Sequence, residues 1–351
     1  MKKKVAVLGA TGTVGQRICH MLRDHPWFDV STITAGSSAG KVYGEAVNWL
    51  MPGDVPLELE EKSVLPSKPE GLNVDFAFSA LPSKIAKKVE PEFAEAGIPV
   101  VSNASAFRME EDVPLIVPEI NPDHIELIEN QRENRGWDGF ITTDPNCSTI
   151  NFVLALKPLQ DTLSIRKVIV TTMQAISGAG YPGVPSLDIL DNVIPYIGGE
   201  EEKMKIETLK VLGSLEEGRV RNAPFAIAAS CNRVPVYDGH LESVYIEAEK
   251  EIDLDEVKDA FRKYEGKAYE LGLPTAPNDP VILREELDRP QTRLDRMAGS
   301  IPGMSVTVGR LRHSTDPNSI QFSVLGHNTI RGAAGGAILV AELLASKGWI
   351  D

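Results

Sequence analysis

Cysteine is scarce in this chain. Cys19, Cys147 and Cys231 are the three cysteines in 351 residues, and no two of them have C-x-x-C spacing. This odd number excludes a disulfide framework and a zinc knuckle, and it suits a reducing compartment. The six histidines show no H-x-x-x-H pattern, so we expect no metal site. Apolar runs of about 18 residues are also missing, so we expect a cytoplasmic protein without a membrane partner.

Positive charge is also in short supply. Lys and Arg number 36 against 50 Asp and Glu, giving a formal net charge of −14. This balance argues against a nucleic-acid partner or an anionic membrane surface. If the substrate is an anion, the cations that bind it must be clustered locally. The chain is long enough for about two domains, and 42% hydrophobic residues allow a sizeable core.

A glycine-rich turn follows the first apolar run. Residues 4–8 read as a buried strand, Gly9-Ala-Thr-Gly-Thr-Val-Gly15 follows, and residues 16–22 continue with helical periodicity. Strand, glycine turn and helix are the context of a dinucleotide site, with a pyrophosphate at the helix N-terminus. The alternative is a plain tight turn. We expect cofactor contacts from Gly9, Thr11, Gly12, Thr13 and Val14.

The second expected strand, residues 29–35, bears on the choice of cofactor. No carboxylate follows it, whereas Ser37, Ser38 and Lys41 do. An NAD site would place an acid there for the ribose hydroxyls, so the loop favours NADP, unless it is an ordinary Gly/Ser loop. A third buried strand, within residues 74–82, ends near Ser79, Ala80 and Leu81, where cofactors lie in such sheets.

The wider pattern predicts an α/β chain. Strands and helices alternate up to about residue 145, including expected strands at 99–102, 114–118 and 139–143, which favours a doubly wound, mostly parallel Rossmann-type sheet. From about residue 166 longer strands predict an α+β domain with a largely antiparallel sheet. A small-residue helix ends the chain. The expected domains are 1–146, 147–328 and 329–351.

Cys147 lies at the start of a predicted helix. It follows Asp144-Pro-Asn and precedes an apolar run at 150–156 that predicts a helix. A thiol at a helix N-terminus faces unpaired N–H groups and the positive end of the dipole, which favour the nucleophilic thiolate. The alternative is a buried structural cysteine.

Other polar residues are candidates for a substrate site. Arg233 offers a guanidinium fork that matches a carboxylate, or else a surface ion pair, and His240 follows seven residues later at a strand edge, or else lies in an exposed loop. Gln174 ends an apolar strand as a pocket amide or a core amide. Arg108 follows a predicted strand at its carboxyl end. Glu200, Lys203 and Glu207 share one face of a predicted helix, which is either part of the site or a solvated charged face.

Five motifs occur in order along the whole chain: Gly9-Ala-Thr-Gly-Thr-Val-Gly15, Asp144-Pro-Asn-Cys147, Gln174-Ala-Ile-Ser-Gly-Ala-Gly180, Arg233-Val-Pro-Val-Tyr-Asp-Gly-His240 and Asn328-Thr-Ile-Arg-Gly-Ala-Ala-Gly335. Together they resemble the aspartate-β-semialdehyde dehydrogenase family, in the branch found in archaea and fungi. The resemblance implies NADPH-dependent reduction of L-aspartyl-4-phosphate to L-aspartate-4-semialdehyde, in lysine, threonine, methionine and isoleucine biosynthesis. It also implies a homodimer or homotetramer, a catalytic and dimerisation domain, and a C-terminal helix that returns to the NADP domain.

The resemblance further implies residue roles. Cys147 is the nucleophile, Gln174 orients the substrate and His240 is the acid/base. The resemblance implies that Arg233 binds the substrate carboxylate and that Glu200 lies near the substrate ammonium. It implies that Arg108 and Lys203 bind the phosphate, with Asn146 and Glu207 as further substrate-binding residues. Ser177, Gly178 and Asn328 join the cofactor site. The alternatives are a malonyl-CoA (or succinyl-CoA) reductase on the same scaffold, against which Asn146 argues, and a non-catalytic dinucleotide sensor, which would not need this set of residues.

Overall fold

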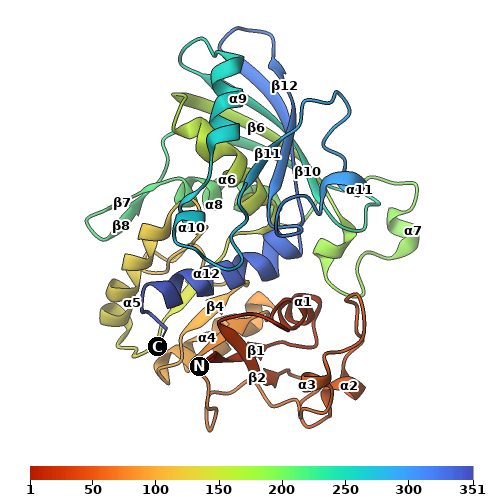
Figure 1. Cartoon of the computed structure of the whole chain (residues 1–351), viewed down its shortest axis with the longest axis vertical. Helices are drawn as coiled ribbons and strands as arrows, with labels where there is room; N and C mark the ends of the chain where they lie inside the picture. The colour runs from red at the N-terminus through yellow and green to blue at the C-terminus, as the bar shows by residue number, and fades with distance from the viewer. Residues whose placement is uncertain (351) are drawn as a thin grey trace.

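The computed structural model describes residues 1–350. Figure 1 shows two bodies along the long axis, one built on a small sheet from the N-terminal part of the chain and one on a larger sheet from later residues. The N-terminus and the last described residues both lie on the first body. No helix within residues 1–350 is long and apolar enough to cross a membrane.

The first sheet has five parallel strands in the order β2-β1-β3-β4-β5. They are β1 (Lys3–Leu8), β2 (Phe28–Thr34), β3 (Phe76–Ser79), β4 (Val100–Ser102) and β5 (Ile141–Thr143). Since β2 lies on one side of β1 and β3 on the other, the strand order reverses at β1, and ligands bind at the carboxyl ends of strands at such a switch point. The predicted parallel, doubly wound sheet is confirmed.

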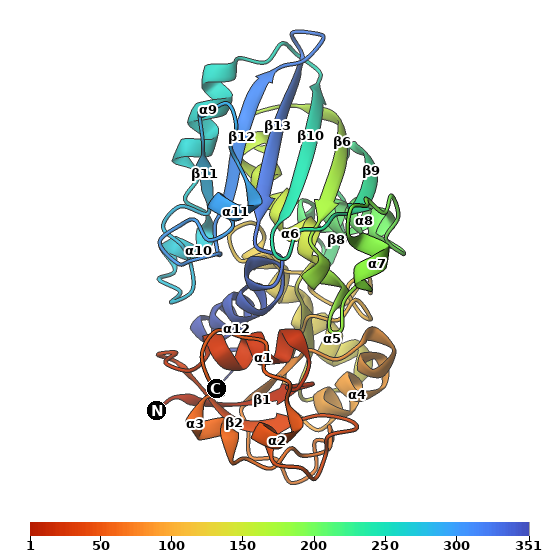
Figure 2. The same ribbon diagram turned by 90° about the vertical axis from the view of Figure 1, so that its right-hand side faces the viewer.

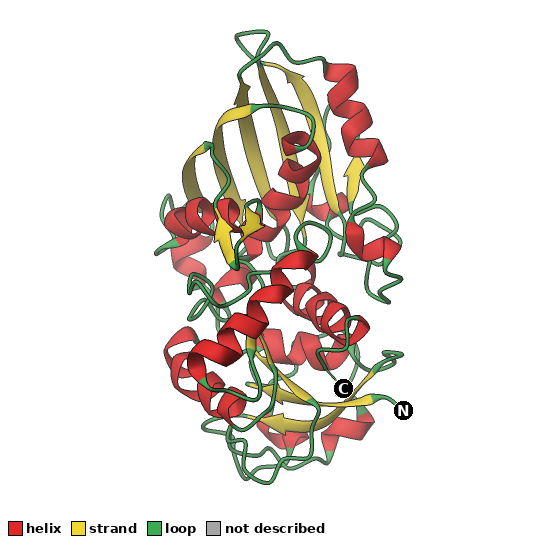
Figure 3. Cartoon of the chain, turned by 90° about the vertical axis from the view of Figure 1, so that its left-hand side faces the viewer, coloured by secondary structure: helices red, strands yellow, loops and turns green. Residues whose placement is uncertain are grey.

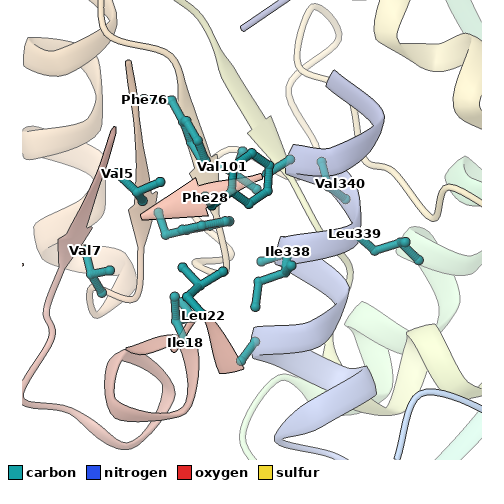
Figure 4. Close-up of a cluster of buried hydrophobic side chains, with 14 of the residues drawn as sticks. Val5, Val7, Ile18, Leu22, Phe28, Phe76, Val101, Ile338, Leu339 and Val340 are labelled. Carbon is teal, nitrogen blue, oxygen red and sulfur yellow. The ribbon is translucent and has the colours of Figure 1, made fainter. Parts of the chain in front are cut away.

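Helices cover both faces of this sheet. On one face α1 (Thr13–Met21) packs with α12 (Gly335–Ser346), the helix that ends the chain, and on the other lies α4 (Ser83–Glu95). Figure 4 shows this core, where side chains of α12 meet α1 and the strands: Val5, Val7, Ile18, Leu22, Phe28, Phe76, Val101, Ile338, Leu339 and Val340. The C-terminal helix therefore returns to the first sheet, as expected.

The second sheet has six strands in the order β11-β12-β13-β10-β6-β9. They are β6 (Ile165–Gln174), β9 (Ala226–Arg233), β10 (His240–Ala248), β11 (Val281–Leu283), β12 (Val306–His313) and β13 (Ser319–Gly326). The central pairs β12–β13, β13–β10 and β10–β6 are antiparallel, whereas the outer pairs β11–β12 and β6–β9 are parallel. The predicted, largely antiparallel sheet is confirmed, with a parallel pair at each edge.

Three helices cover one face of the second sheet: α6 (Cys147–Gln160), α8 (Glu200–Val211) and α9 (Leu254–Lys263). Figure 3 shows this helical layer, and Figure 2 shows the opposite face of the sheet without a helical cover. Alternation along β6 matches this, because Val168 and Val170 are buried while Ile169 and Thr171 are exposed. One face of the sheet is thus not covered by helices of the chain.

The remaining elements are short. They are α2 (Tyr43–Ala46), α3 (Leu57–Glu60), α5 (Leu127–Arg135), α7 (Ser186–Ile189), β7 (Ser214–Glu216), β8 (Arg219–Arg221), α10 (Lys267–Glu270) and α11 (Thr292–Asp295), with 3₁₀ turns at Pro122–Glu126 and Ile176–Ala179 and a π-helical turn at Ile330–Ala334. The segment from Pro122 to Arg135 thus begins as a 3₁₀ turn and becomes α-helical at Leu127.

The strand expected at residues 114–118 is wrong. That run makes one isolated bridge, between Leu115 and Thr143 beside β5. The carbonyl of Pro114 accepts the N–H of Thr143, and the N–H of Ile116 donates to the carbonyl of Thr143. Pairing with β5 stops there, because the flanking residues Pro114 and Pro118 have no backbone N–H to donate. The apolar side chains are buried as a loop rather than as a sixth strand.

Candidate active site

Cys147 is the first residue of α6, and Asn146 caps this helix. Oδ1 of Asn146 accepts from the N–H groups of Ser148 at 3.0 Å and Thr149 at 3.4 Å, which satisfies two of the free donors at the helix start. Its Nδ2 donates to Glu200 at 2.9 Å. Asn146 therefore fixes the nucleophile turn and links it to α8. Its predicted substrate contact remains a prediction.

His240 lies beside the thiol. Its Nε2 is 3.2 Å from Sγ of Cys147, while its Nδ1 accepts the backbone N–H of Ala175 at 3.0 Å. The ring is fully buried at the first position of β10. The pairing of β10 with β6 brings it to the loop after Gln174. Cys147 and His240, 93 positions apart in sequence, thus have a sulfur and a ring nitrogen within hydrogen-bond distance.

The charges around Cys147 oppose one another. Burial, and after it the Glu200 carboxylate, raise the pKa of the Cys147 thiol to about 12, although the cations Arg233, Arg108 and Lys203 act to lower this pKa. The sequence predicted a favoured thiolate from the helix start. In the structure, burial acts against that effect and raises the pKa of the thiol.

Arg233 and Gln174 lie side by side, because β9 pairs with β6 in a register that matches these two residues. Arg233 is 7% exposed and donates to the carbonyl of Ala175 at 2.7 Å. Gln174 is buried, and its Nε2 donates to Thr172 at 3.2 Å. A Cβ placed on Gly178 would lie 3.0 Å from the Arg233 guanidinium and 3.2 Å from the His240 ring, so the glycine lets both side chains approach it.

Helix α8 carries the three charged residues that the sequence placed on one face. Glu200 pairs with Lys203 at 2.8 Å and is only 7% exposed, so Glu200 does not lie on a solvated charged face; the substrate contacts of both residues remain predictions. Glu207 is buried, and its two oxygens hold Arg108 at 3.1 Å and the backbone N–H of Asn146 at 2.7 Å. In this structure Glu207 thus positions other residues; its predicted substrate contact remains a prediction.

A cavity of about 340 Å³ joins the two domains at Cys147. Its walls come from the start of α1, the loop after β4, the nucleophile turn, the loop after β6 and the π-helical turn: Thr13, Val14, Asn103, Arg108, Asn146, Cys147, Ser177, Gly178, Ala179, Gly180, Asn328, Thr329, Gly332 and Ala333. The predicted cofactor residues Thr13, Val14, Ser177, Gly178 and Asn328 therefore meet the predicted nucleophile in one crevice.

The glycine turn has the shape that a dinucleotide site needs. Gly9 has φ +78°, and a Cβ on Gly15 would lie 2.3 Å from the carbonyl oxygen of Gly9, so both positions require glycine. Gly12 is the N-cap of α1 and makes no side-chain cap, which leaves the helix N-terminus open beside Thr11 and Thr13. Backbone N–H groups in this setting suit a pyrophosphate.

Other predicted cofactor residues lie farther out. Ser37, Ser38 and Lys41 are in the loop after β2 and are absent from the described lining of the cavity. Ser79 is fully buried, and its carbonyl already accepts the backbone N–H of Asn103. Ala80 and Leu81 follow it at the carboxyl end of β3, next to Gly9. Their cofactor contacts remain predictions.

Asn328 is held on two sides within the crevice. Its Oδ1 accepts the N–H of Gly239 at 2.8 Å, and its Nδ2 donates to Ser177 at 2.8 Å. Asn328 thus connects the segment after β13 with the turn before His240 and with the loop after β6.

Two contributors to the site were missed in the sequence. A Cβ on Gly332 would lie 2.8 Å from that of Cys147, so the π-helical turn packs directly against the nucleophile. Lys210 is buried and donates to the carbonyls of Arg108, Glu110 and Val113, which shapes the Arg108 loop. The glycine-rich run at 332–336 was a signal for Gly332, whereas nothing local marks Lys210.

Comparisons with known proteins agree with this geometry. Residues 4–128 match the family model described as semialdehyde dehydrogenase, NAD binding domain, and residues 156–331 match semialdehyde dehydrogenase, dimerisation domain. The chain is 55% identical over 344 residues to an aspartate-semialdehyde dehydrogenase of Methanothermobacter thermautotrophicus, covering 97% of this chain and 98% of that protein. A malonyl CoA reductase (NADP) of Metallosphaera sedula is 42% identical over 353 residues, covering 99% and 98%.

A solved structure is similar over the whole chain. The crystal structure of aspartate semialdehyde dehydrogenase with NADP from Candida albicans matches with a TM-score of 0.91 at 43% identity, covering 99% of both chains. Fold and site together define a two-domain dehydrogenase with a cysteine at the domain junction. The chain belongs to the aspartate-semialdehyde dehydrogenase family and is an oxidoreductase.

Proposed function

We propose that the protein catalyses the reversible, NADPH-dependent reduction of L-aspartyl-4-phosphate to L-aspartate-4-semialdehyde and phosphate through a thioester on Cys147. One observation carries this proposal. Sγ of Cys147 lies 3.2 Å from Nε2 of His240 in the crevice that reaches the start of α1. The aldehyde product would serve the biosynthesis of lysine, threonine, methionine and isoleucine.

The charged residues suit a substrate with three charged groups. Arg233 commits NH1 to a carbonyl and retains further donors for a carboxylate. Glu200 offers a counter-charge for an ammonium. Arg108 faces the crevice, and its buried Nε has no hydrogen-bond partner within residues 1–350, so it suits a phosphate oxygen, assisted by Lys203. This local clustering places cations for an anionic substrate in an acidic protein.

The first domain fits NADP. The uncapped N-terminus of α1 and the glycine turn suit the pyrophosphate, and the loop with Ser37, Ser38 and Lys41 lacks the carboxylate that would repel a 2′-phosphate. NADP in the Candida albicans relative supports this assignment. When bound, the reduced cofactor supplies the hydride.

The reaction then depends on Cys147. After losing its proton to solvent, the sulfur attacks the acyl carbon, forms the C–S bond and displaces phosphate. The thioester accepts a hydride, and collapse of the adduct returns the sulfur and releases the aldehyde. Gln174 and Arg233 hold the substrate so that the acyl carbon faces Sγ, which lowers the entropic cost of the attack.

We further propose a homodimer through the uncovered face of the second sheet and the segment at 181–196. The chain carries the family's dimerisation domain, and this segment exposes apolar side chains that a second copy would bury: Tyr181, Leu187, Leu190, Val193 and Tyr196. Leu187 alone is 93% exposed. A double variant with Leu187→Asp and Leu190→Asp should have the mass of a monomer in light scattering. An unchanged dimer mass would contradict this interface.

The proposed activity is tested by NADP⁺ reduction with aspartate semialdehyde, with and without phosphate. We expect turnover that requires phosphate, and none for Cys147→Ala. The same enzyme is assayed with malonyl-CoA and NADPH, because the Metallosphaera sedula relative is a malonyl CoA reductase. Faster turnover of malonyl-CoA with NADPH than of aspartate semialdehyde with NADP⁺ and phosphate would reject the proposal in favour of that reaction.

A further inference from the structure

A buried ion pair holds the π-helical turn that packs against Cys147. Nη1 and Nη2 of Arg331 donate to the two carboxylate oxygens of Glu119 at 2.6 and 2.8 Å. Arg331 is 0% exposed and Glu119 is 2% exposed. The two residues are 212 positions apart, because Glu119 follows the run that bridges to β5 and Arg331 follows β13. The pair therefore joins two segments that reach the crevice from different sheets.

The turn that carries Arg331 is wound more widely than an α-helix. The N–H groups of Gly332 and Ala334 donate at 3.0 and 3.3 Å to the carbonyls of His327 and Thr329, each five residues earlier. Such single π-helical turns are rare and are frequently found at functional sites. Four residues of this segment line the crevice: Asn328, Thr329, Gly332 and Ala333. The conformation of the turn thus decides which atoms form this wall of the crevice.

The partner of Arg331 is itself held firmly. The backbone carbonyl of Glu119 accepts from the Tyr264 hydroxyl at 3.0 Å and from the N–H of Lys267 at 3.2 Å. A Cβ on Gly266 would lie 2.8 Å from that of Glu119, so a glycine there lets the loop close on this residue. Arg331 therefore pairs with a carboxylate whose position is fixed by the chain around it.

A buried ion pair is a weak contributor to stability. Taking two charges out of water is costly, and apolar side chains of similar volume often replace such a pair without loss of stability. A bidentate pair supplies direction instead, because it fixes the orientation of the guanidinium. Arg331 directly precedes Gly332, and a Cβ on Gly332 would lie 2.8 Å from that of Cys147. A shift of Arg331 is therefore transmitted to the wall beside the nucleophile.

We propose that Arg331 is a positioning residue for the reaction on Cys147, because its fork on Glu119 keeps the π-helical turn in register and the crevice wall closed against the nucleophile. The inference rests on the proposed function. Without the pair, the turn can relax to the hydrogen bonding of an α-helix, which spans one residue fewer. That change would rotate Gly332 relative to Asn328, whose two hydrogen bonds across the crevice would then be strained.

Two variants test this role through kcat. In the double variant Arg331→Met with Glu119→Leu, apolar side chains replace both charges, so we expect the urea midpoint of the wild type. Arg331→Lys keeps the charge opposite Glu119 but loses the fork. Since a displacement of about 1 Å can cost about 100-fold in rate, kcat for aspartate semialdehyde should fall at least about tenfold in the double variant and about threefold in Arg331→Lys. KM should change less than kcat, because Arg233 and Glu200 are untouched.

Alkylation of Cys147 by iodoacetamide reports on the same wall without turnover. A shifted turn covers Cys147 less, so at fixed pH both variants should react at least about threefold faster than the wild type. Lys157→Met with Asp161→Leu removes an ion pair at the C-terminal end of α6 and should change neither kcat nor alkylation. Wild-type kcat and alkylation in either Arg331 variant, or a lower urea midpoint in the double variant, would overturn the inference. Because alkylation needs no substrate, failure of the proposed activity would be distinguishable from failure of this role.

Discussion

The backbone N–H of Asn146 donates to Oε2 of Glu207 at 2.7 Å, and the other oxygen of Glu207 holds Arg108 at 3.1 Å. One buried carboxylate on α8 therefore fixes both the residue before the nucleophile and the cation proposed for the phosphate. The residue before Cys147 and a cation of the crevice are thus positioned by the same carboxylate.

Glu207→Gln should destabilise the fold and slow the reaction. The substitution leaves the buried Arg108 without its counter-charge, and breaking such a pair costs about 3 kcal/mol. Urea unfolding measures the loss, and kcat/KM for aspartyl phosphate should fall as Arg108 shifts. Glu202→Gln, on an exposed position of the same helix, is the matched control. Equal unfolding free energies for the two variants would refute this support.

Arg233→Lys should impair both KM and kcat. Lysine keeps the charge but loses the planar fork that matches a carboxylate, so the acyl carbon is held less well against Sγ. We expect kcat/KM for aspartate semialdehyde to fall about 30- to 1,000-fold, from about 2–4 kcal/mol of lost contact. Arg221→Lys, on exposed β8, is the control. If Arg233→Lys keeps the wild-type kcat/KM, another cation must bind the substrate carboxylate.

Alkylation of Cys147 by iodoacetamide should accelerate with pH without a plateau near neutrality. The reactive species is the thiolate, and the pKa of the half-buried Cys147 thiol is raised to about 12, so the thiolate fraction keeps rising to at least about pH 9. Glu200→Gln removes a carboxylate that raises this pKa and should speed alkylation at fixed pH. Cys147→Ala reports labelling of Cys19 and Cys231, both buried. A plateau below about pH 8 would show a stabilised thiolate instead.

The enzyme should prefer NADP over NAD, and Ser37→Asp should reduce that preference. A carboxylate near the ribose repels a 2′-phosphate, and about 1–2 kcal/mol of repulsion corresponds to a tenfold or larger loss of kcat/KM with NADP. Activity with NAD should change little. Ser37→Ala removes the hydroxyl without adding charge and is the control. Equal kcat/KM for the two cofactors in the wild type argues against the assignment of this loop.

Much of the site was predictable because its parts are local. The glycine turn between β1 and α1 and the cysteine at the start of α6 follow from short patterns with a defined backbone role. The closeness of Gln174, Arg233 and His240 depends instead on β6 lying between β9 and β10, a pairing that spacing along the chain does not reveal. The motifs indicated the residues, and the sheet order explains their convergence.

Where the sequence misled, a non-local effect was responsible. Residues 226–233 alternate weakly between small residues, so strand β9 was not expected, yet it forms the edge of the sheet. The helix N-terminus favoured a thiolate at Cys147. Burial has the opposite effect on the pKa of this thiol, and it depends on the π-helical turn, which packs against Cys147 from the far end of the chain. The divisions at residues 146 and 329 remain predictions.

The central claim is a covalent bond between substrate and Cys147, and trapping it is the most direct test. Mixing enzyme, aspartate semialdehyde and NADP⁺ without phosphate should let hydride transfer occur while the thioester waits for its acceptor. We predict a burst of about one NADPH per active site, and acid-quenched mass spectrometry should show one aspartyl group on the peptide that contains Cys147. A burst without this adduct, or an adduct on Cys231, would contradict the account.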